Sequence, residues 1–275
     1  MRLTRCYVPP PLVAESETML PSGASAHVAK VLRLRAGAEL TLFDGRGGEY
    51  QATMLALERR GAVRVRIGTH RALEREAPVA ITLLQCLVRG ERMDLIVQKA
   101  TELGVAAIVP VDSRHGLVRL EPAAAARRQQ HWLAVAIGAC EQCGRNRLPE
   151  LQAVQSFERA CEQIEATGAP ATGTRLLLDP TGTQSFAQAL QVHAAAPRIP
   201  QLTLLLGPEG GLSDDERSQA QQHGFAICQL GPRILRAETA PLAALATVQA
   251  LLGDFGARTT FVHRGDARRS WPGGG

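Results

Sequence analysis

The pattern of apolar and polar residues changes near residue 78. Beyond this point, short continuous apolar runs alternate with longer segments of helical period. The apolar runs predict strands at 79–84, 106–111, 175–179, 202–206 and 225–230, and the helical segments cover 91–103, 122–139 and 239–252. Continuous apolar strands are typical of a parallel sheet that is covered on both faces. The alternation of strands and helices therefore predicts an α/β domain with right-handed crossovers.

The first 72 residues have a different pattern. Short strands are predicted at 39–44, 49–57 and 62–67, after a short helix at 24–35 that places Val28, Val31 and Leu32 on one side. In the last strand apolar residues alternate with arginines, so one face is buried and the other is basic and exposed. The pattern predicts a small β-barrel-like module of about 70 residues, a size that carries RNA in many proteins. Residues 73–78 are polar, end in proline and form the predicted linker.

Two glycine-proline loops follow predicted strands, GPEGG at 207–211 and GPRILR at 231–236. Ser213 and Glu216 have the spacing of a capping box, so a helix begins directly after the first loop. Thr239 is predicted to cap the next helix. Loops at the carboxyl ends of parallel strands form a crevice in which small ligands bind. Glu209 and the acidic start of the helix would repel a phosphate, so a neutral or cationic ligand is favoured.

Composition and charge limit the possible functions of the chain. The chain has 275 residues, enough for two domains, and a net charge of +5. Residues 1–72 contain 11 basic and 6 acidic residues, 73–257 contain 16 and 19, and 258–275 contain 4 and 1. The positive charge of the first domain and the tail suits a phosphate backbone, although a solvated surface is the alternative. The tail, 258–275, has little periodicity and is expected to be disordered.

No apolar run reaches about 18 residues and the start lacks the apolar core of a secretory signal, so a cytoplasmic protein without a membrane partner is expected. The six cysteines are scattered, and only Cys140 and Cys143 form a C-x-x-C. A zinc ribbon needs a second pair, so no metal is expected and free structural thiols are favoured.

Several of these segments carry a resemblance to a known family. LLLGPEGGLS at 204–213 and LGPRILRAETA at 230–240 resemble the two hallmark motifs of the RsmE family, ribosomal small subunit RNA (uracil-N3) methyltransferases of the SPOUT superfamily. HVAKVLR at 27–33, LFDG at 42–45, QKATELGV at 98–105 and ACEQCGRNR at 139–147 are also similar to that family. The resemblance covers about residues 1–255, in order.

The resemblance implies a fold and a set of partners. Residues 1–72 would form a PUA-like RNA-binding β-barrel domain, and 73–257 an α/β SPOUT methyltransferase domain with a parallel sheet and a C-terminal trefoil knot. S-adenosylmethionine would bind in the knotted loops, ribosomal RNA of the small subunit would be the substrate, and the protein would be a homodimer. The reaction would need no metal.

The resemblance also implies roles for particular residues. Removal of the N3 proton of uracil spreads negative charge over O2 and O4, which a guanidinium would stabilise. Arg236 is the candidate, with Glu209 for positioning or proton acceptance; the alternative is that Arg233 and Arg236 are surface arginines paired with Glu209 or Glu238. The predicted cofactor-binding residues are Leu178, Leu206, Gly207, Pro208, Gly210, Gly211, Leu230, Gly231, Ile234, Leu235 and Thr239. The predicted RNA-binding residues are Arg33, Arg64, Arg66, Arg114, Arg145, Asn146 and Arg147.

Two residues depart from the second motif. Ala237 replaces a threonine and Pro241 replaces a small residue. A lost hydroxyl weakens one hydrogen bond, but the loop is otherwise intact and activity is expected to survive. Two other functions remain open. One is 2′-O-ribose methylation of RNA, and the other is an RNA-binding assembly factor without catalysis, which Ala237 alone favours.

Overall fold

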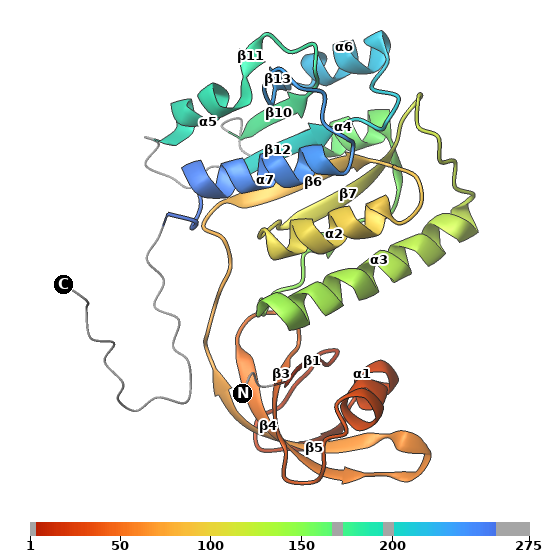
Figure 1. The fold of residues 1–275 in the computed structure, drawn as a ribbon, viewed down its shortest axis with the longest axis vertical. Helices are drawn as coiled ribbons and strands as arrows, with labels where there is room; N and C mark the ends of the chain where they lie inside the picture. The colour runs from red at the N-terminus through yellow and green to blue at the C-terminus, as the bar shows by residue number, and fades with distance from the viewer. Residues whose placement is uncertain (1–3, 167–172, 195–200, 257–275) are drawn as a thin grey trace, which may run out of the picture.

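The computed structural model describes residues 4–166, 173–194 and 201–256. Within these residues the chain forms two units, one around a 5-stranded sheet and one around an 8-stranded sheet. The two units lie at opposite ends of an elongated molecule, with helix α3 (Pro122–Cys143) between them (Figure 1). The tail at 258–275 lies outside the described residues, so its predicted disorder stays a prediction.

The N-terminal unit is a strongly curved sheet in the order β1-β3-β4-β5-β2. β1 and β3 are parallel, and the other pairs are antiparallel. The strands are β1 (Thr4–Tyr7), β2 (Glu17–Met19), β3 (Glu39–Phe43), β4 (Glu49–Leu57) and β5 (Val63–Arg71). Val63, Val65 and Ile67 of β5 are buried, whereas Arg64 and Arg66 project from the other face. The predicted alternation of this strand is therefore confirmed.

The helix of this unit is shorter than predicted. α1 (Ser22–Ala26) continues into one π-helical stretch, His27–Val31, and does not reach residue 35. Of the three apolar residues expected on one side, only Val28 is buried, because the wider turn rotates Val31 to 67% exposure. The strands β1 and β2 gave no periodic signal because they are short and lie at the two edges of the sheet.

The C-terminal unit is an α/β domain whose paired strands are parallel, as the apolar pattern predicted. The sheet order is β11-β13-β10-β12-β6-β7-β8, with β9 pairing β7. Its strands are β6 (Ala80–Cys86), β7 (Ala107–Asp112), β8 (Glu150–Leu151), β9 (Gln155–Ser156), β10 (Thr174–Leu178), β11 (Gln184–Ser185), β12 (Gln201–Leu206) and β13 (Ala226–Gln229). Besides α3, its helices are α2 (Arg92–Glu102), α4 (Phe157–Ala166), α5 (Phe186–Ala194), α6 (Asp214–Gln222) and α7 (Thr239–Leu251).

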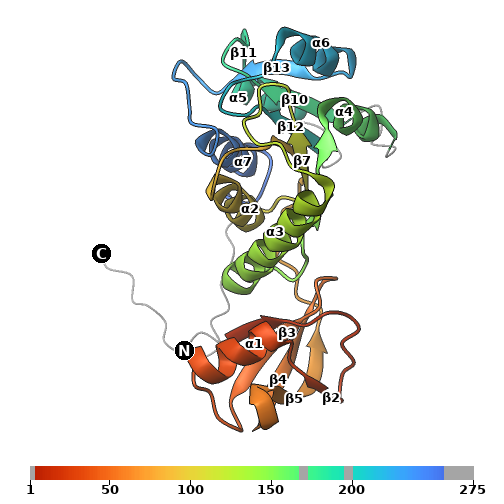
Figure 2. The ribbon, with the colours of Figure 1, turned by 90° about the vertical axis from the view of Figure 1, so that its right-hand side faces the viewer.

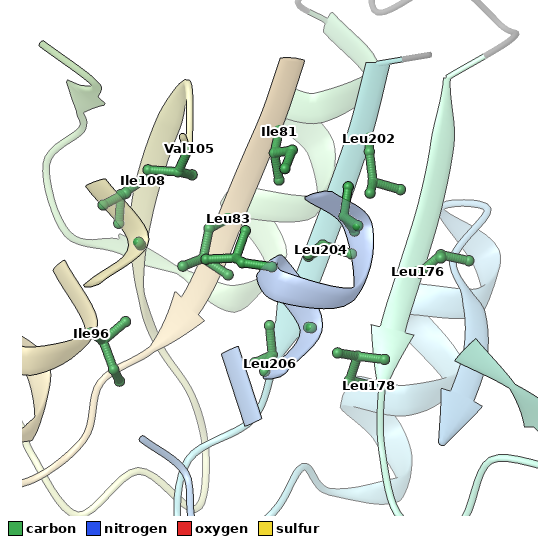
Figure 3. Packing of buried hydrophobic residues seen from close by; sticks show 14 of the residues in the cluster. Ile81, Leu83, Ile96, Val105, Ile108, Leu176, Leu178, Leu202, Leu204 and Leu206 are labelled. Carbon is green, nitrogen blue, oxygen red and sulfur yellow. The ribbon is translucent and has the colours of Figure 1, made fainter. Parts of the chain in front are cut away.

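Helices cover both faces of this sheet. α2 and α7 lie on one face and α4 lies on the other (Figure 2). The strands are apolar throughout because successive side chains serve opposite faces. Leu204 and Leu206 pack in the core beneath α7, beside Leu83 and Leu176 of the neighbouring strands (Figure 3). Leu205, between them, is buried in the core of the opposite face.

The starts of the last two helices differ in how they are capped. Ser213 Oγ accepts from the backbone N–H of Glu216, and the Glu216 carboxylate accepts from the N–H of Ser213, so the predicted capping box is confirmed. The predicted cap at Thr239 is wrong. Residue 238 is the N-cap of α7, and no side chain caps it. The N–H of Thr239 donates to the carbonyl of Arg236, because the preceding loop turns tightly into the helix.

Candidate active site between the glycine-proline loops

Three neighbouring strands end at the same edge of the sheet, and their loops enclose a cavity of about 470 Å³. The strands are β13, β10 and β12, adjacent in that order. The cavity lies within the size range of ligand pockets. The lining residues are Arg92, Leu178, Asp179, Pro180, Leu206, Gly207, Pro208, Glu209, Gly211, Leu212, Leu230, Gly231, Arg233, Ile234, Leu235, Arg236, Ala237, Glu238 and Ala240. The two glycine-proline loops thus form a single site.

The loop conformations explain the glycines. Gly231 has φ +104° and Gly211 has φ +71°, backbone conformations that side chains with a Cβ rarely adopt. At Gly207 a Cβ would lie 3.3 Å from Leu212 Cγ. Glycine at these positions lets the two loops approach each other and leaves backbone atoms facing the cavity.

Most of the predicted cofactor-binding residues line the cavity, but two do not. Gly210 is outside the lining: a Cβ there would lie 3.0 Å from the carbonyl oxygen of His115, so this glycine allows loop packing. Thr239, the first residue of α7, is exposed and is also outside the lining, whereas the next residue, Ala240, is part of it. Both predicted catalytic residues, Arg236 and Glu209, line the cavity.

The structure also brings in residues that sequence reasoning missed. Arg92, at the start of α2, lies between the two loops: Nη1 is 2.9 Å from Glu209 Oε1, and Nε is 3.8 Å from Glu238 Oε1. The sequence offered Arg233 and Arg236 as alternative partners of these glutamates. Both arginines are exposed, and no ion pair joins them to any described residue. Glu238 stands inside the second motif, and the sequence offered it only as an ion-pair partner of these arginines.

Glu209 is held as an anion. Burial raises the pKa of its carboxyl, but the backbone N–H groups of Arg89 and of Glu209 itself, together with the guanidinium of Arg92, outweigh burial and lower the pKa below its ordinary value. The Arg89 N–H donates to Glu209 Oε1 at 3.1 Å. The carboxylate therefore ties the first glycine-proline loop to the segment before α2.

The third loop is braced by Asp179. Its Oδ1 accepts from both the backbone N–H and the hydroxyl of Thr181, at 2.8 and 2.6 Å. The Asp179 N–H donates to the carbonyl of Cys228, which joins the end of β10 to β13. This bonding holds the cavity wall at Leu178–Pro180 in place before any ligand binds.

Comparison with known proteins agrees with this site. A family model described as an RNA methyltransferase domain matches residues 75–249, and one described as an RNA methyltransferase PUA domain matches residues 20–67. The ribosomal RNA small subunit methyltransferase E of Synechocystis is 32% identical, over 90% of this chain and 78% of that protein. The same enzyme of Buchnera aphidicola is 28% identical, over 92% of this chain and 98% of that protein. The chain belongs to the RsmE family of RNA methyltransferases.

Solved structures of similar proteins support the fold of this RsmE family member. A ribosomal RNA small subunit methyltransferase E from Neisseria gonorrhoeae, bound to S-adenosylmethionine, is 35% identical with a TM-score of 0.80. A Legionella pneumophila methyltransferase in complex with the same cofactor is 35% identical with a TM-score of 0.84. Each comparison covers 92% of this chain and 100% of the other. The expected SPOUT-type sheet with an N-terminal PUA-like domain is confirmed.

The predicted RNA-binding arginines are spread over both units. Arg64 pairs with Glu17 and Glu58 at 3.0 and 2.9 Å, and Arg66 lies 3.8 Å from Glu17. Two more of these arginines form ion pairs: Arg114 with Asp215 at 2.7 Å and Arg147 with Glu74 at 3.2 Å. Arg33 is exposed and has φ +50°. The basic face of β5 is therefore partly neutralised by its own acidic neighbours.

Two of the predicted RNA-binding residues are buried between the units. Arg145 is 5% exposed; its guanidinium donates to the carbonyls of Thr101 and Val105 at 2.8 and 3.0 Å and pairs with Glu76 at 2.5 Å. Asn146 is fully buried and bonds to Leu73 O and Arg5 Nη2, both at 2.6 Å. The Arg145 guanidinium thus ties the linker to the C-terminal unit, and Asn146 bonds to the linker and to Arg5 of the N-terminal unit. Because these polar groups are already occupied, the structure does not favour direct RNA contact by the two residues, and that contact stays a prediction.

The cysteines behave as structural thiols. All six are free, and burial raises the pKa of Cys140 to about 12. In the described parts of the chain, no group of three or more His, Cys, Asp or Glu side chains is arranged to hold a metal ion. No helix among the described residues is long and apolar enough to cross a membrane.

Proposed function

We propose that this protein transfers a methyl group from S-adenosylmethionine to N3 of a uridine in small-subunit ribosomal RNA. The observation that carries the proposal is the cavity enclosed by the two glycine-proline loops, whose sequences resemble the two hallmark motifs of the RsmE family. The relatives named as small-subunit methyltransferases and the similar structures crystallised with S-adenosylmethionine support the substrate and the cofactor.

The lining of the cavity fits this cofactor. Leu178, Leu206, Leu230 and Leu235 provide apolar walls for a flat adenine, and the loops offer backbone donors and acceptors for its edge. Gly207 and Gly231 keep space that a Cβ would fill or strain. Three acidic and three basic side chains line the cavity, so their formal charges cancel, and the fit rests on the apolar walls and the loop backbone. When bound, S-adenosylmethionine supplies an electrophilic methyl group on a sulfonium sulfur.

Two residues of the chain have separate roles in the proposed reaction, one in stabilising charge and one in positioning a loop. Arg236, exposed at the cavity and without an ion-pair partner in the described structure, is available to stabilise negative charge on uracil O2 or O4. Glu209 positions the first loop through Arg89 and Arg92. An in-line displacement at a sulfonium needs no metal, so we propose none.

We further propose that residues 1–72 bind RNA and that 73–257 hold the cofactor and the reacting groups. The net charge of +5 on the first segment supports this division, since positive charge favours a phosphate backbone. A homodimer, which the family resemblance implies, is also part of the proposal. The proposal also includes a C-terminal trefoil knot and a location in the cytoplasm, where ribosomal subunits are made.

The test uses small ribosomal subunits from a strain that lacks this protein. They are incubated with the purified protein and S-adenosylmethionine, and the digested RNA is analysed by mass spectrometry. N3-methyluridine is expected. A ribose-methylated nucleoside would indicate the 2′-O-methyltransferase alternative, and cofactor binding without any methylated product would refute the activity.

Arg236→Ala tests the division of roles within the site. Its turnover is expected to fall about 100- to 1,000-fold, the usual effect of removing one charge-stabilising donor, while cofactor affinity changes little. Arg233→Ala is the matched control, since it removes the same charge from the same loop. Equal losses in the two variants would show that only the total charge of the loop matters.

A further inference from the structure

One carboxylate in the cavity is not satisfied by the protein. Glu238 lies on the loop before α7 and lines the cavity, and its side chain is 16% exposed. Its Oε1 is 3.8 Å from Arg92 Nε. Its Oε2 is buried and has no hydrogen-bond partner among the described residues. Buried polar atoms normally have a partner, so an unpaired oxygen on a residue that lines a ligand cavity points to a partner that the ligand supplies.

The second glutamate of the cavity is in the opposite situation. Glu209 Oε1 already accepts from the N–H of Arg89 and from Arg92. These donors hold the pKa of Glu209 below its ordinary value, against the effect of burial. A carboxylate stabilised in this way is a weak proton acceptor, so the proton-accepting role that the sequence allowed for Glu209 does not suit it.

We propose that Glu238 is a catalytic residue that accepts the N3 proton of the target uracil. This inference rests on the proposed function. The N3–H bond breaks as a bond forms between the proton and Oε2, and the N3 electron pair forms the new bond to the methyl carbon. The bond from that carbon to sulfur breaks, its electron pair stays on sulfur, and a neutral thioether leaves. Glu238 then returns its proton to water.

The surrounding charges match this role. Arg92 Nη1 binds Glu209, and Arg92 Nε lies 3.8 Å from Oε1 of Glu238, whose Oε2 has no partner among the described residues. Arg236, two residues earlier on the same loop, provides a cation for the charge that develops on uracil. The charged groups that line the cavity with Glu238 are Arg92, Asp179, Glu209, Arg233 and Arg236. A proton acceptor and a charge-stabilising group therefore lie on one loop.

The test compares Glu238→Gln with Glu209→Gln on two substrates. One is small subunits assembled from ordinary transcribed RNA, and the other is subunits whose RNA contains 5-fluorouridine, in which N3–H is more acidic. Glu238→Gln is expected to lower kcat on ordinary RNA about 100- to 10,000-fold, the usual contribution of a general base. It should regain much of this loss on fluorinated RNA and at high pH, where N3 ionises without help. The kcat of Glu209→Gln should fall by the same factor on both RNAs.

A second readout does not depend on turnover. The affinity of Glu238→Gln for S-adenosylmethionine, measured by calorimetry, should equal that of the unaltered protein. Loss of this affinity would make Glu238 a cofactor ligand and overturn the proposal. If Glu238→Gln loses the same factor of kcat on both RNAs and its pH profile is unchanged, Glu238 has only a structural role, and the proposal is overturned.

Two further points separate the possible failures. If the unaltered protein forms no N3-methyluridine, the proposed function fails before the variants are compared. If Glu238→Gln does not fold, Glu238→Asp keeps the carboxylate, and its rate should still fall as the pH drops through the titration of that carboxyl. Absence of this acidic limb from Glu238→Asp would overturn the role of Glu238.

Discussion

Replacing Gly231 with alanine tests how the second glycine-proline loop holds the cofactor. Gly231 has φ +104°, and a Cβ added there meets nothing within 4 Å. The substitution therefore introduces no clash, and its whole effect is backbone strain. A residue with a Cβ in such a sparsely populated conformation costs about 1–3 kcal/mol.

This strain must appear in one of two measurements. If the loop relaxes in the cofactor-free protein, binding must restore its strained conformation. The Kd for S-adenosylmethionine then rises about 5- to 140-fold, since about 1.4 kcal/mol corresponds to a factor of 10. If the loop does not relax, the free energy of unfolding without cofactor falls by the same amount. The losses of binding and unfolding free energy should together come to about 1–3 kcal/mol.

Calorimetry with S-adenosylmethionine and urea unfolding of the cofactor-free protein provide the two numbers. Gly138→Ala is the control, because Gly138 lies exposed in α3 and a Cβ there would also meet nothing within 4 Å. It should stabilise the protein by up to about 1 kcal/mol, the helix preference of alanine over glycine, without changing cofactor affinity. If Gly231→Ala changes neither measured quantity, the conformation of this loop is not what limits binding.

Three further predictions concern the rest of the molecule. Arg145→Ala should lower the unfolding free energy by about 3–5 kcal/mol in urea titrations, because it leaves the Glu76 carboxylate of the linker and the carbonyls of Thr101 and Val105 without their partner; a loss no larger than that caused by removing an exposed arginine would contradict this. Burial raises the pKa of Glu49, but Arg5 and Arg75 outweigh it and lower the pKa below 4.5. The stability advantage over Glu49→Gln should therefore be present above pH 4.5 and disappear as the pH falls further; an advantage that persists in acid would refute this. Alkylation of the native protein, followed by peptide mass spectrometry, should label half-buried Cys143 before the buried cysteines, and early labelling of a buried thiol would contradict their packing.

Local sequence pattern determined most of the secondary structure of the C-terminal unit. Continuous apolar runs predicted the central strands, and Ser213 with Glu216 predicted the start of α6, because strand burial and capping depend on neighbouring residues. The two loop motifs also identified most of the cavity lining. The short edge strands β1 and β2 were missed because a strand of three or four residues has too little periodicity to detect.

Tertiary structure alone decided which charged groups meet. Arg92 stands far from Glu209 and Glu238 in the sequence. It reaches Glu209 because β6 and β12 are neighbours in the sheet, and Glu238 because α7 packs against α2. Arg145 and Asn146 belong to a run that reads as a basic surface, yet the turn after α3 places them between the two units. The loop motifs were visible in the sequence because they are contiguous. Whether a polar side chain in them meets a protein partner or remains open to a ligand depends on strand order, which brings together residues far apart in the chain.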